Sequence, residues 1–189
     1  MTDNKIILGF VGDLAAGKGT ICKYLKEKYN VNSYRYSTIL RDIIKRLYIP
    51  ESRENLQLMS TTLRQNFGQD LMSKIIALDV EKDPNKIVAV EGIRRPTDIT
   101  YLEKLPGFNL IYITAQPKIR WERLVKRAEN PGDTEKTFTE FLADEQAEAD
   151  RSIKELGKHA KYTINNDGDF ENLYQQMEEI LRKIYENKN

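Results

Sequence analysis

A glycine-rich segment near the N-terminus has the residue types and spacing that most clearly point to a chemistry. It reads GDLAAGKGT and fits the pattern G-x-x-x-x-G-K. Glycines at its two fixed positions allow backbone geometry that a side chain would block, so the loop N–H groups can turn toward phosphate oxygens. A helix beginning near Lys18 would direct its positive end at the same oxygens, and the lysine would add a full charge. The segment therefore predicts a phosphate site for ATP, with contacts from Gly12, Asp13, Ala15, Ala16, Gly17, Lys18, Gly19 and Thr20.

The elements around this segment predict where other functional residues must lie. Short apolar runs alternate with helical patterns, which indicates βαβ units and a parallel sheet. Ligands of such sheets bind outside the carboxyl ends of the strands, so the residues just after each strand matter most. A capping box at Thr137 and Glu140 predicts the start of a long helix. The expected strands are 6–11, 31–36, 87–90, 110–113 and 162–164, and the expected helices include 19–29, 38–47, 56–63, 71–80, 97–105, 118–127 and 170–185.

The phosphate loop and the motifs after it resemble those of adenylate kinase and its nucleoside monophosphate kinase relatives. The middle and C-terminal parts are also similar to dephospho-coenzyme A kinases, and the resemblance covers most of the chain by motif order. It implies an α/β P-loop NTPase fold, with a five-stranded parallel sheet of order 2-3-1-4-5 flanked by helices and a short helical lid. It further implies one domain over residues 1–189, with an acceptor-binding helical insertion at 37–80 and a lid region at 120–152.

Two segments resemble the acceptor side of adenylate kinases. YSTILR, which comes after the second expected strand, is similar to S-T-G-D-x-L-R, so Ser37 and Arg41 are expected to bind the acceptor phosphate. EGIRRP, which comes after the third, is similar to D-G-F-P-R, so Arg95 and its neighbour Arg94 are expected to do the same. Glu91 takes the acidic position of that motif, where a carboxylate organises Mg²⁺ and its waters.

In this chain the hydroxyl residue that ligates Mg²⁺ in such loops stands one position later than usual. Gly19 stands where Ser or Thr is usual, so Thr20 must supply the hydroxyl, or Mg²⁺ is held mainly through water. The expected metal ligands are therefore Thr20 and Glu91.

Arginines that recur at helical spacing mark the donor side. Arg120, Arg123 and Arg127 would place three guanidiniums on one helix face, where they could stabilise the charge of phosphoryl transfer. The similar R-x-x-x-R of adenylate kinases implies a catalytic lid role for Arg123 and Arg127. The arginine of the family's G-R-x-D-D is missing from NPGDT, and Arg151 is expected to replace its charge. The loop after the last strand is expected to border the adenine through Asn166 and Gly168.

Composition excludes several other classes of protein. Thirty Lys and Arg against 29 Asp and Glu give a net charge of +1, which provides no basic field for nucleic acid. One cysteine and one histidine exclude a disulfide framework and the common zinc sites within one chain. No apolar stretch reaches membrane-spanning length, and the N-terminus does not read as a signal peptide. We expect a cytoplasmic protein whose partner is a small phosphate acceptor; no oligomeric state is predicted.

Three functions remain open from the sequence. The first is an ATP-dependent nucleoside monophosphate kinase, whose anionic acceptor needs arginines and no strong base. The second is a P-loop kinase with a hydroxyl acceptor, such as dephospho-coenzyme A; Asp13 or Asp42 would then be the base, because Ser37 and Thr38 stand where an aspartate is usual. The third is a nucleotide-binding ATPase or switch with a macromolecular partner.

Overall fold

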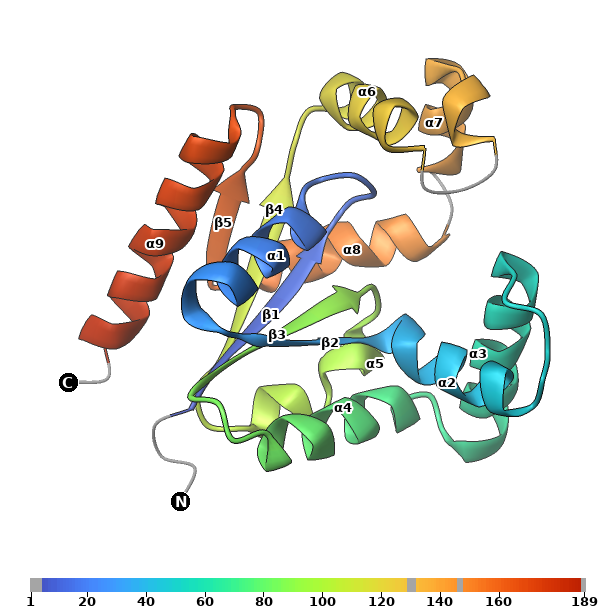
Figure 1. Cartoon of the computed structure of the whole chain (residues 1–189), viewed down its shortest axis with the longest axis horizontal. Coiled ribbons are helices and arrows are strands. Elements are labelled where there is room, and N and C mark those ends of the chain that lie inside the picture. The colour runs from blue at the N-terminus through green and yellow to red at the C-terminus, as the bar shows by residue number, and fades with distance from the viewer. Residues whose placement is uncertain (1–4, 129–131, 146–147, 188–189) are drawn as a thin grey trace.

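A five-stranded parallel sheet forms the centre of the molecule, in the order β2-β3-β1-β4-β5 (Figure 1). The computed structural model describes residues 5–128, 132–145 and 148–187, with 148–151 described by their backbone alone. The predicted fold class and strand order 2-3-1-4-5 are confirmed. The strands are β1 (Ile6–Gly12), β2 (Asn32–Arg35), β3 (Ile87–Ile93), β4 (Phe108–Thr114) and β5 (Tyr162–Asn165).

Helices cover both faces of this sheet. On one face α1 and α9 pack against it, and on the other α4 and α8 do so, while α2 and α3 project beyond the β2 edge (Figure 1). The described helices are α1 (Lys18–Tyr29), α2 (Tyr36–Arg46), α3 (Arg53–Phe67), α4 (Leu71–Lys82), α5 (Pro96–Ile99), α6 (Pro117–Arg127), α7 (Phe138–Asp144), α8 (Glu148–His159) and α9 (Phe170–Glu186), with short 3₁₀ turns at Leu102–Lys104 and Asp133–Glu135.

The central strands are apolar throughout because both of their faces are covered. In β1, Leu8 and Phe10 contribute to the core beneath α1 and α9, whereas Ile7 and Val11 contribute to the core on the opposite face. This division reflects the two-residue period of a strand, whose successive side chains point to opposite faces. The unbroken run IILGFV is thus explained by two cores rather than one.

Two predicted elements differ in length or continuity from those observed. The helix expected at 97–105 is divided into α5 and the 3₁₀ turn Leu102–Lys104. The capping box at Thr137 is present, with the Thr137 N–H donating to Glu140 Oε2 at 2.8 Å. The long helix predicted to begin there is wrong, because α7 ends at Asp144 and α8 begins at Glu148.

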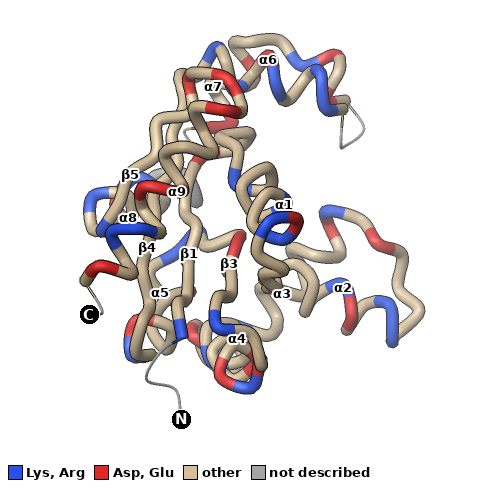
Figure 2. Tube along the Cα trace, turned by 60° about the vertical axis from the view of Figure 1, so that its left-hand side comes forward, with Lys and Arg blue, Asp and Glu red and all other residues tan. Residues whose placement is uncertain are grey.

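Charges of both signs are distributed over all parts of the described chain (Figure 2). Within the described residues, no helix is long and apolar enough to cross a membrane.

Candidate active site

The loop between β1 and α1 depends on its two motif glycines for room. A Cβ on Gly12 would lie 2.2 Å from the backbone oxygen of Ile113 in β4. A Cβ on Gly17 would lie 2.2 Å from Nδ2 of Asn166, and Gly17 also has a φ of +111°, a value that L side chains rarely adopt. The loop therefore passes closer to its neighbours than any other residue type would permit.

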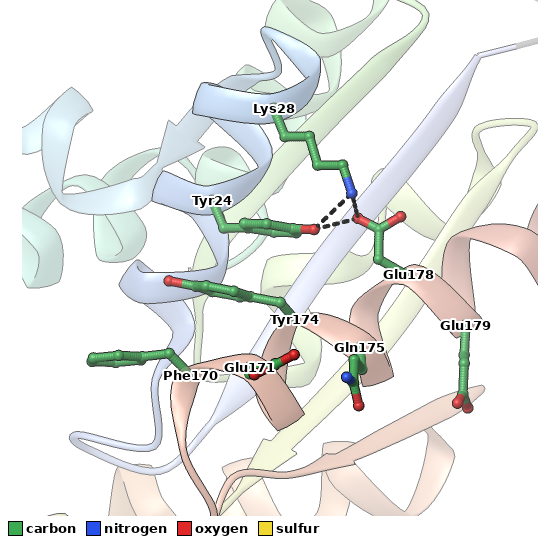
Figure 3. Close-up of a pocket in the computed structure, with 8 residues that line it drawn as sticks. All are labelled: Tyr24, Lys28, Phe170, Glu171, Tyr174, Gln175, Glu178 and Glu179. Carbon is green, nitrogen blue, oxygen red and sulfur yellow. Dashed lines mark hydrogen bonds and ion pairs between the residues drawn. The ribbon is translucent and has the colours of Figure 1, made fainter.

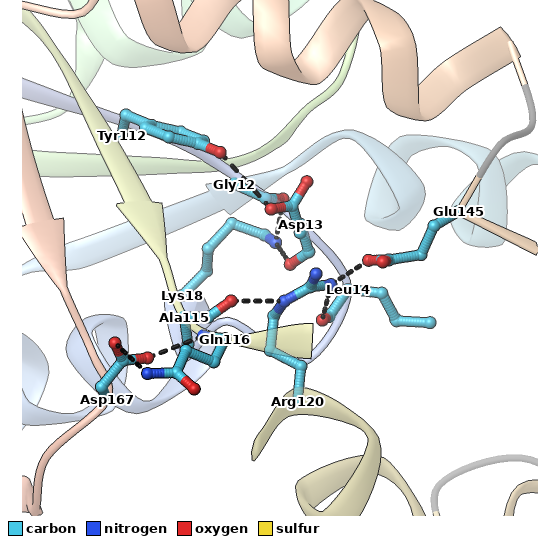
Figure 4. A network of polar contacts seen from close by, with 10 residues as sticks. All are labelled: Gly12, Asp13, Leu14, Lys18, Tyr112, Ala115, Gln116, Arg120, Glu145 and Asp167. Carbon is cyan, nitrogen blue, oxygen red and sulfur yellow. Dashed lines mark hydrogen bonds and ion pairs between the residues drawn. The ribbon is translucent and has the colours of Figure 1, made fainter. Parts of the chain in front are cut away.

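Lys18, the first residue of α1, turns back toward the start of the loop (Figure 4). Its Nζ donates to the carbonyl oxygens of Gly12 at 2.6 Å and of Asp13 at 2.8 Å. Burial, followed by the positive charge of Arg94, lowers the pKa of Lys18 to about 8, although Asp13 and Glu91 oppose the shift. The lysine is thus held inside the loop by two uncharged acceptors, and a polyphosphate would bind it more strongly.

Asn166 connects the end of β5 to the phosphate loop. Its Nδ2 donates to the carbonyl oxygen of Ala16 at 2.8 Å, and the side chain is buried. Arg123 from α6 donates to the backbone oxygen of Asn166 at 2.8 Å and to that of Gly168 at 3.3 Å. The structure therefore brings four sequence-predicted residues together, Ala16, Arg123, Asn166 and Gly168, but it places Arg123 beside the expected adenine loop and not over the phosphate loop.

The arginine that reaches the phosphate loop is Arg120, one turn into α6. Its side chain is 4% exposed and forms an ion pair with Glu145, the residue directly after α7 (Figure 4). Nε donates to Ala115 O at 2.8 Å, and Nη1 donates to Leu14 O in the loop at 3.4 Å. The guanidinium also lies over the ring of Phe141, 5.5 Å from its centroid.

The helical spacing predicted that Arg120 shares a face with Arg123 and Arg127, and the resemblance to adenylate kinases implied the lid role for the latter two only. Arg120 lies nearest to the end of β4, and Arg127 is about 10 Å farther along the axis, at the last turn of α6. The rule that ligands bind where parallel strands end could have selected Arg120. The side chain of Arg151 lies outside the described residues, so its expected role stays a prediction.

Glu91 is buried at the end of β3 and has a partner that the sequence did not reveal. Its Oε1 accepts a hydrogen bond from Nη2 of Arg35 at 2.8 Å, and the two residues are register neighbours in β3 and β2. The carboxylate also raises the pKa of Lys18, so the two charges lie within electrostatic range. Arg35 therefore holds the Glu91 side chain by an ion pair across the strand register, within electrostatic range of Lys18.

These groups fit ATP and Mg²⁺. The side of the loop at Gly19 is open, since a Cβ on Gly19 would have no atom within 4 Å. The described residues contain no cluster of three or more His, Cys, Asp or Glu that could hold a metal. Mg²⁺ in phosphate sites is generally bound through one or two protein oxygens, substrate phosphates and water. Thr20 and Glu91 stay the predicted protein ligands.

A buried carboxylate organises the turn that presents Arg94 and Arg95. Asp98 Oδ2 accepts the backbone N–H groups of Arg94 at 2.9 Å and of Arg95 at 3.0 Å. Its Oδ1 pairs with Nη2 of Arg64 from α3 at 2.7 Å, and both side chains are less than 10% exposed. Arg94 and Arg95 have exposed side chains at the end of β3, and Arg94 acts electrostatically on Lys18.

Arg41 and Ser37 lie on the first turns of α2. Arg41 pairs with Glu51 through Nε at 2.5 Å and donates to Ser37 Oγ at 3.2 Å. The start of α2 lies against the end of β3, since a Cβ on Gly92 would be 3.9 Å from the backbone nitrogen of Tyr36. The two segments that the sequence predicts to bind the acceptor are therefore neighbours.

The two alternative bases have different environments. Asp13 is 5% exposed within the phosphate loop, and Oδ2 accepts from the Tyr112 hydroxyl at 3.4 Å. Asp42 is exposed on α2. Of the two, Asp13 is the one that lies next to Lys18.

Sheet order and phosphate loop together define a P-loop protein of kinase-like fold. The family model described as "AAA domain" matches residues 11–141, from the end of β1 to α7, and the chain belongs to this family. It is 29% identical over 184 residues to a UPF0200 protein of Pyrococcus abyssi, covering 95% of this chain and 97% of the relative. It is 27% identical over 180 residues to a UPF0200 protein of Sulfurisphaera tokodaii, covering 94% and 97%.

Solved structures show the same fold at low identity. Shikimate kinase of Bacteroides thetaiotaomicron superposes with a TM-score of 0.63 at 16% identity, covering 95% of this chain and 98% of that one. Shikimate kinase of Acinetobacter baumannii superposes with a TM-score of 0.55 at 14% identity, covering 98% of this chain and 96% of that one.

Proposed function

We propose that this protein is an ATP-dependent phosphotransferase that transfers the γ-phosphoryl group to a nucleoside monophosphate. The observation that carries the proposal is the electrostatic proximity of Lys18 in the phosphate loop to Arg94 at the end of β3. Lys18 belongs to the donor side and Arg94 to the segment expected to hold the acceptor. Two positive charges from these two segments suit a site in which two anionic groups must meet.

Mg-ATP, when bound, supplies the phosphoryl group that moves. The chain's own residues bind and orient it: the loop N–H groups and Lys18 hold the phosphates, and Asn166 and Gly168 border the base. Arg120 stands at the loop opening, where it can bind the equatorial oxygens once it leaves Glu145. Closure of α6 and α7 over the site would exclude water and limit hydrolysis.

A phosphate acceptor agrees with the charges near the end of β3. Arg94 and Arg95 are exposed there, and the carboxylate of Glu91 is already paired with Arg35. A nucleoside monophosphate is anionic near neutral pH, so it needs these cations and no strong base. This favours a monophosphate over a hydroxyl acceptor.

A hydroxyl-acceptor kinase is the second candidate, and one contact supports it. Asp13 is buried beside Lys18, and the Tyr112 hydroxyl donates to its carboxylate at 3.4 Å. A carboxylate so placed could accept a hydroxyl proton during transfer.

The test is an ADP-release assay with Mg-ATP and a panel of ribo- and deoxynucleoside monophosphates, together with dephospho-coenzyme A and shikimate. Strong stimulation by one monophosphate is expected, and Lys18→Ala should abolish it in a folded protein. Arg95→Ala should raise the KM for the acceptor more than the KM for ATP. Stimulation by a hydroxyl compound alone would support the Asp13 alternative. No stimulation by any compound, with ATP still bound, would refute both kinases and favour a nucleotide-dependent switch.

A further inference from the structure

A groove lies between α1 and α9, and none of the residues that line it belongs to the phosphate loop (Figure 3). This groove has a volume of about 660 Å³ and is open to solvent. Its lining combines aromatic rings with carboxylates, and α9 contributes most of it. The side chains that give the groove its chemistry are Tyr24 and Lys28 from α1, and Phe170, Glu171, Tyr174, Glu178 and Glu179 from α9.

Three nearly parallel rings form a ladder along the groove. Tyr24 and Tyr174 stack with centroids 4.0 Å apart and an angle of 6° between their planes. The ring centroid of Phe170 lies 6.3 Å from that of Tyr174, with an angle of 14° between the two planes. Phe170 is 66% exposed, which is unusual for a phenylalanine and leaves most of its ring available. The ladder therefore ends in a flat apolar surface that is largely open to solvent.

The positive charge at the groove is already neutralised. Lys28 Nζ donates to Glu178 Oε1 at 3.0 Å, and the same oxygen accepts from the Tyr24 hydroxyl at 2.6 Å. Tyr29 donates to Oε2 of Glu178 at 2.5 Å. Burial opposes the ionised form of Glu178, yet these three donors together lower the pKa of its carboxyl group. Lys28 and Glu178 thus form a closed cluster between the two helices.

Two carboxylates of the groove have no partner among the described residues. Glu171 and Glu179 are exposed, and neither has a hydrogen bond or ion pair to any residue in the described part of the chain. The groove therefore carries a net negative charge beside its rings. Nucleic acid and anionic lipid surfaces would be repelled, although both contain groups that could contact an aromatic ring.

A guanidinium group suits both the exposed aromatic ring and the carboxylates of the groove. It is planar, weakly hydrated and permanently charged, so it can lie against an aromatic face and donate N–H groups to a carboxylate at the same time. An ammonium is compact and strongly hydrated, and it gains less from a ring face. We propose that the groove between α1 and α9 binds an arginine side chain of a partner protein, stacked on the ring of Phe170 and paired with Glu171, while Glu179 adds to the negative charge of the groove.

The probe is a blocked peptide, acetyl-Gly-Arg-Gly-Arg-Gly-amide, compared with the same peptide carrying lysine. Binding to the full-length protein is measured by NMR through the Phe and Tyr ring signals, at low and at physiological salt. We expect the arginine peptide to shift the Phe170 and Tyr174 signals and to bind about fivefold more tightly than the lysine peptide. Added salt should weaken binding, since one component is electrostatic.

Matched variants locate the site. Phe170→Ala, and the pair Glu171→Gln with Glu179→Gln, should each weaken the arginine peptide about fivefold. Tyr185→Ala at the far end of α9, and the pair Glu81→Gln with Glu103→Gln elsewhere on the surface, should leave binding unchanged. All of these side chains are exposed, so the fold should tolerate the changes.

Three outcomes would overturn the proposal: no ring shifts at millimolar arginine peptide, equal affinity for the lysine peptide, or equal losses in the control variants. Tighter binding of an anionic oligonucleotide at the same rings would also overturn it and indicate a nucleic-acid surface. The ATP affinity should be unaffected in every variant, which separates this site from the proposed kinase site.

Discussion

The carboxamide of Asn166 donates a 2.8 Å hydrogen bond to the carbonyl oxygen of Ala16, a residue 150 positions earlier in the chain. The contact is buried, and the glycine at position 17 makes room for it. Because Arg123 holds the backbone of Asn166 in turn, one side chain connects the expected base-binding loop with the phosphate loop. A change at this residue should therefore affect how the donor nucleotide is held.

Replacing Asn166 with alanine should weaken ATP binding about tenfold, since the buried Ala16 carbonyl loses its donor and the loop loses its support. The dissociation constant of Mg-ATP, measured by calorimetry, tests this. Asn165→Ala is the matched control, because Asn165 is the adjacent residue at the end of β5 and its side chain accepts from the backbone N–H of Asp167 and does not bond to the phosphate loop. Equal losses in the two variants would show that the contact with Ala16 has no special role.

ATP binding should take up a proton above about pH 8. The pKa of Lys18 is about 8 without a ligand, so part of the population is neutral there, and the negative phosphates must raise that pKa. Calorimetry at pH 8.5 in buffers of different ionisation enthalpy measures the uptake. Lys18→Arg keeps the charge but does not titrate, so its uptake should vanish. Uptake that persists in Lys18→Arg would assign it to another group.

The same lowered pKa predicts how stability depends on pH. In the unfolded chain the pKa of Lys18 returns to 10.5, so between about pH 8 and 10.5 the unfolded state binds more protons than the folded state. The contribution of Lys18 to the free energy of unfolding therefore rises with pH across that window. Urea unfolding of the wild type and of Lys18→Met is measured at pH 7.5 and 9.5. The free energy of unfolding of the wild type should increase relative to that of the variant at the higher pH. A constant difference between the two proteins would contradict the shift.

Glu145 and bound phosphates should compete for Arg120. The buried ion pair between them holds the guanidinium at the loop opening, and neutralising the acid removes a competitor. Glu145→Gln should tighten Mg-ATP binding severalfold, whereas Arg120→Ala should weaken it. Asp144→Asn serves as the control, since that neighbouring carboxylate pairs with Lys136 at the surface of α7. Weaker ATP binding in Glu145→Gln would mean that the pair supports the site instead of closing it.

Removing Asp98 should cost stability as well as function. Its carboxylate pairs with Arg64 in the interior and accepts two backbone N–H groups, so Asp98→Ala leaves a buried cation without this partner. We expect a loss of about 3 kcal/mol in the free energy of unfolding, measured with urea. Glu155→Ala, which breaks an exposed pair with Lys158, should change stability little. Asp98→Asn, if folded, should still raise the acceptor KM through disorder of the turn at Arg94.

The sequence by itself determined the sheet and the phosphate loop. The apolar runs predicted a parallel sheet, the resemblance carried by the motifs implied its strand order 2-3-1-4-5, and the apolar run in β1 reflects a strand with both faces buried. The phosphate loop could be predicted because its backbone makes a tight turn and a close approach at the glycines. No other residue type permits these, so the sequence itself marks the positions.

The tertiary structure decided which charged side chains meet. Arg120 and Arg123 lie on one helix at helical spacing, yet Arg120 contacts the phosphate loop whereas Arg123 contacts the backbone after β5. Arg35 binds Glu91 through strand register, and Glu145 pairs with Arg120 where α7 has ended and a continuous helix was expected. Such partners lie far apart in sequence, and the choice among many similar arginines depends on differences of a few ångströms that only the packed fold determines.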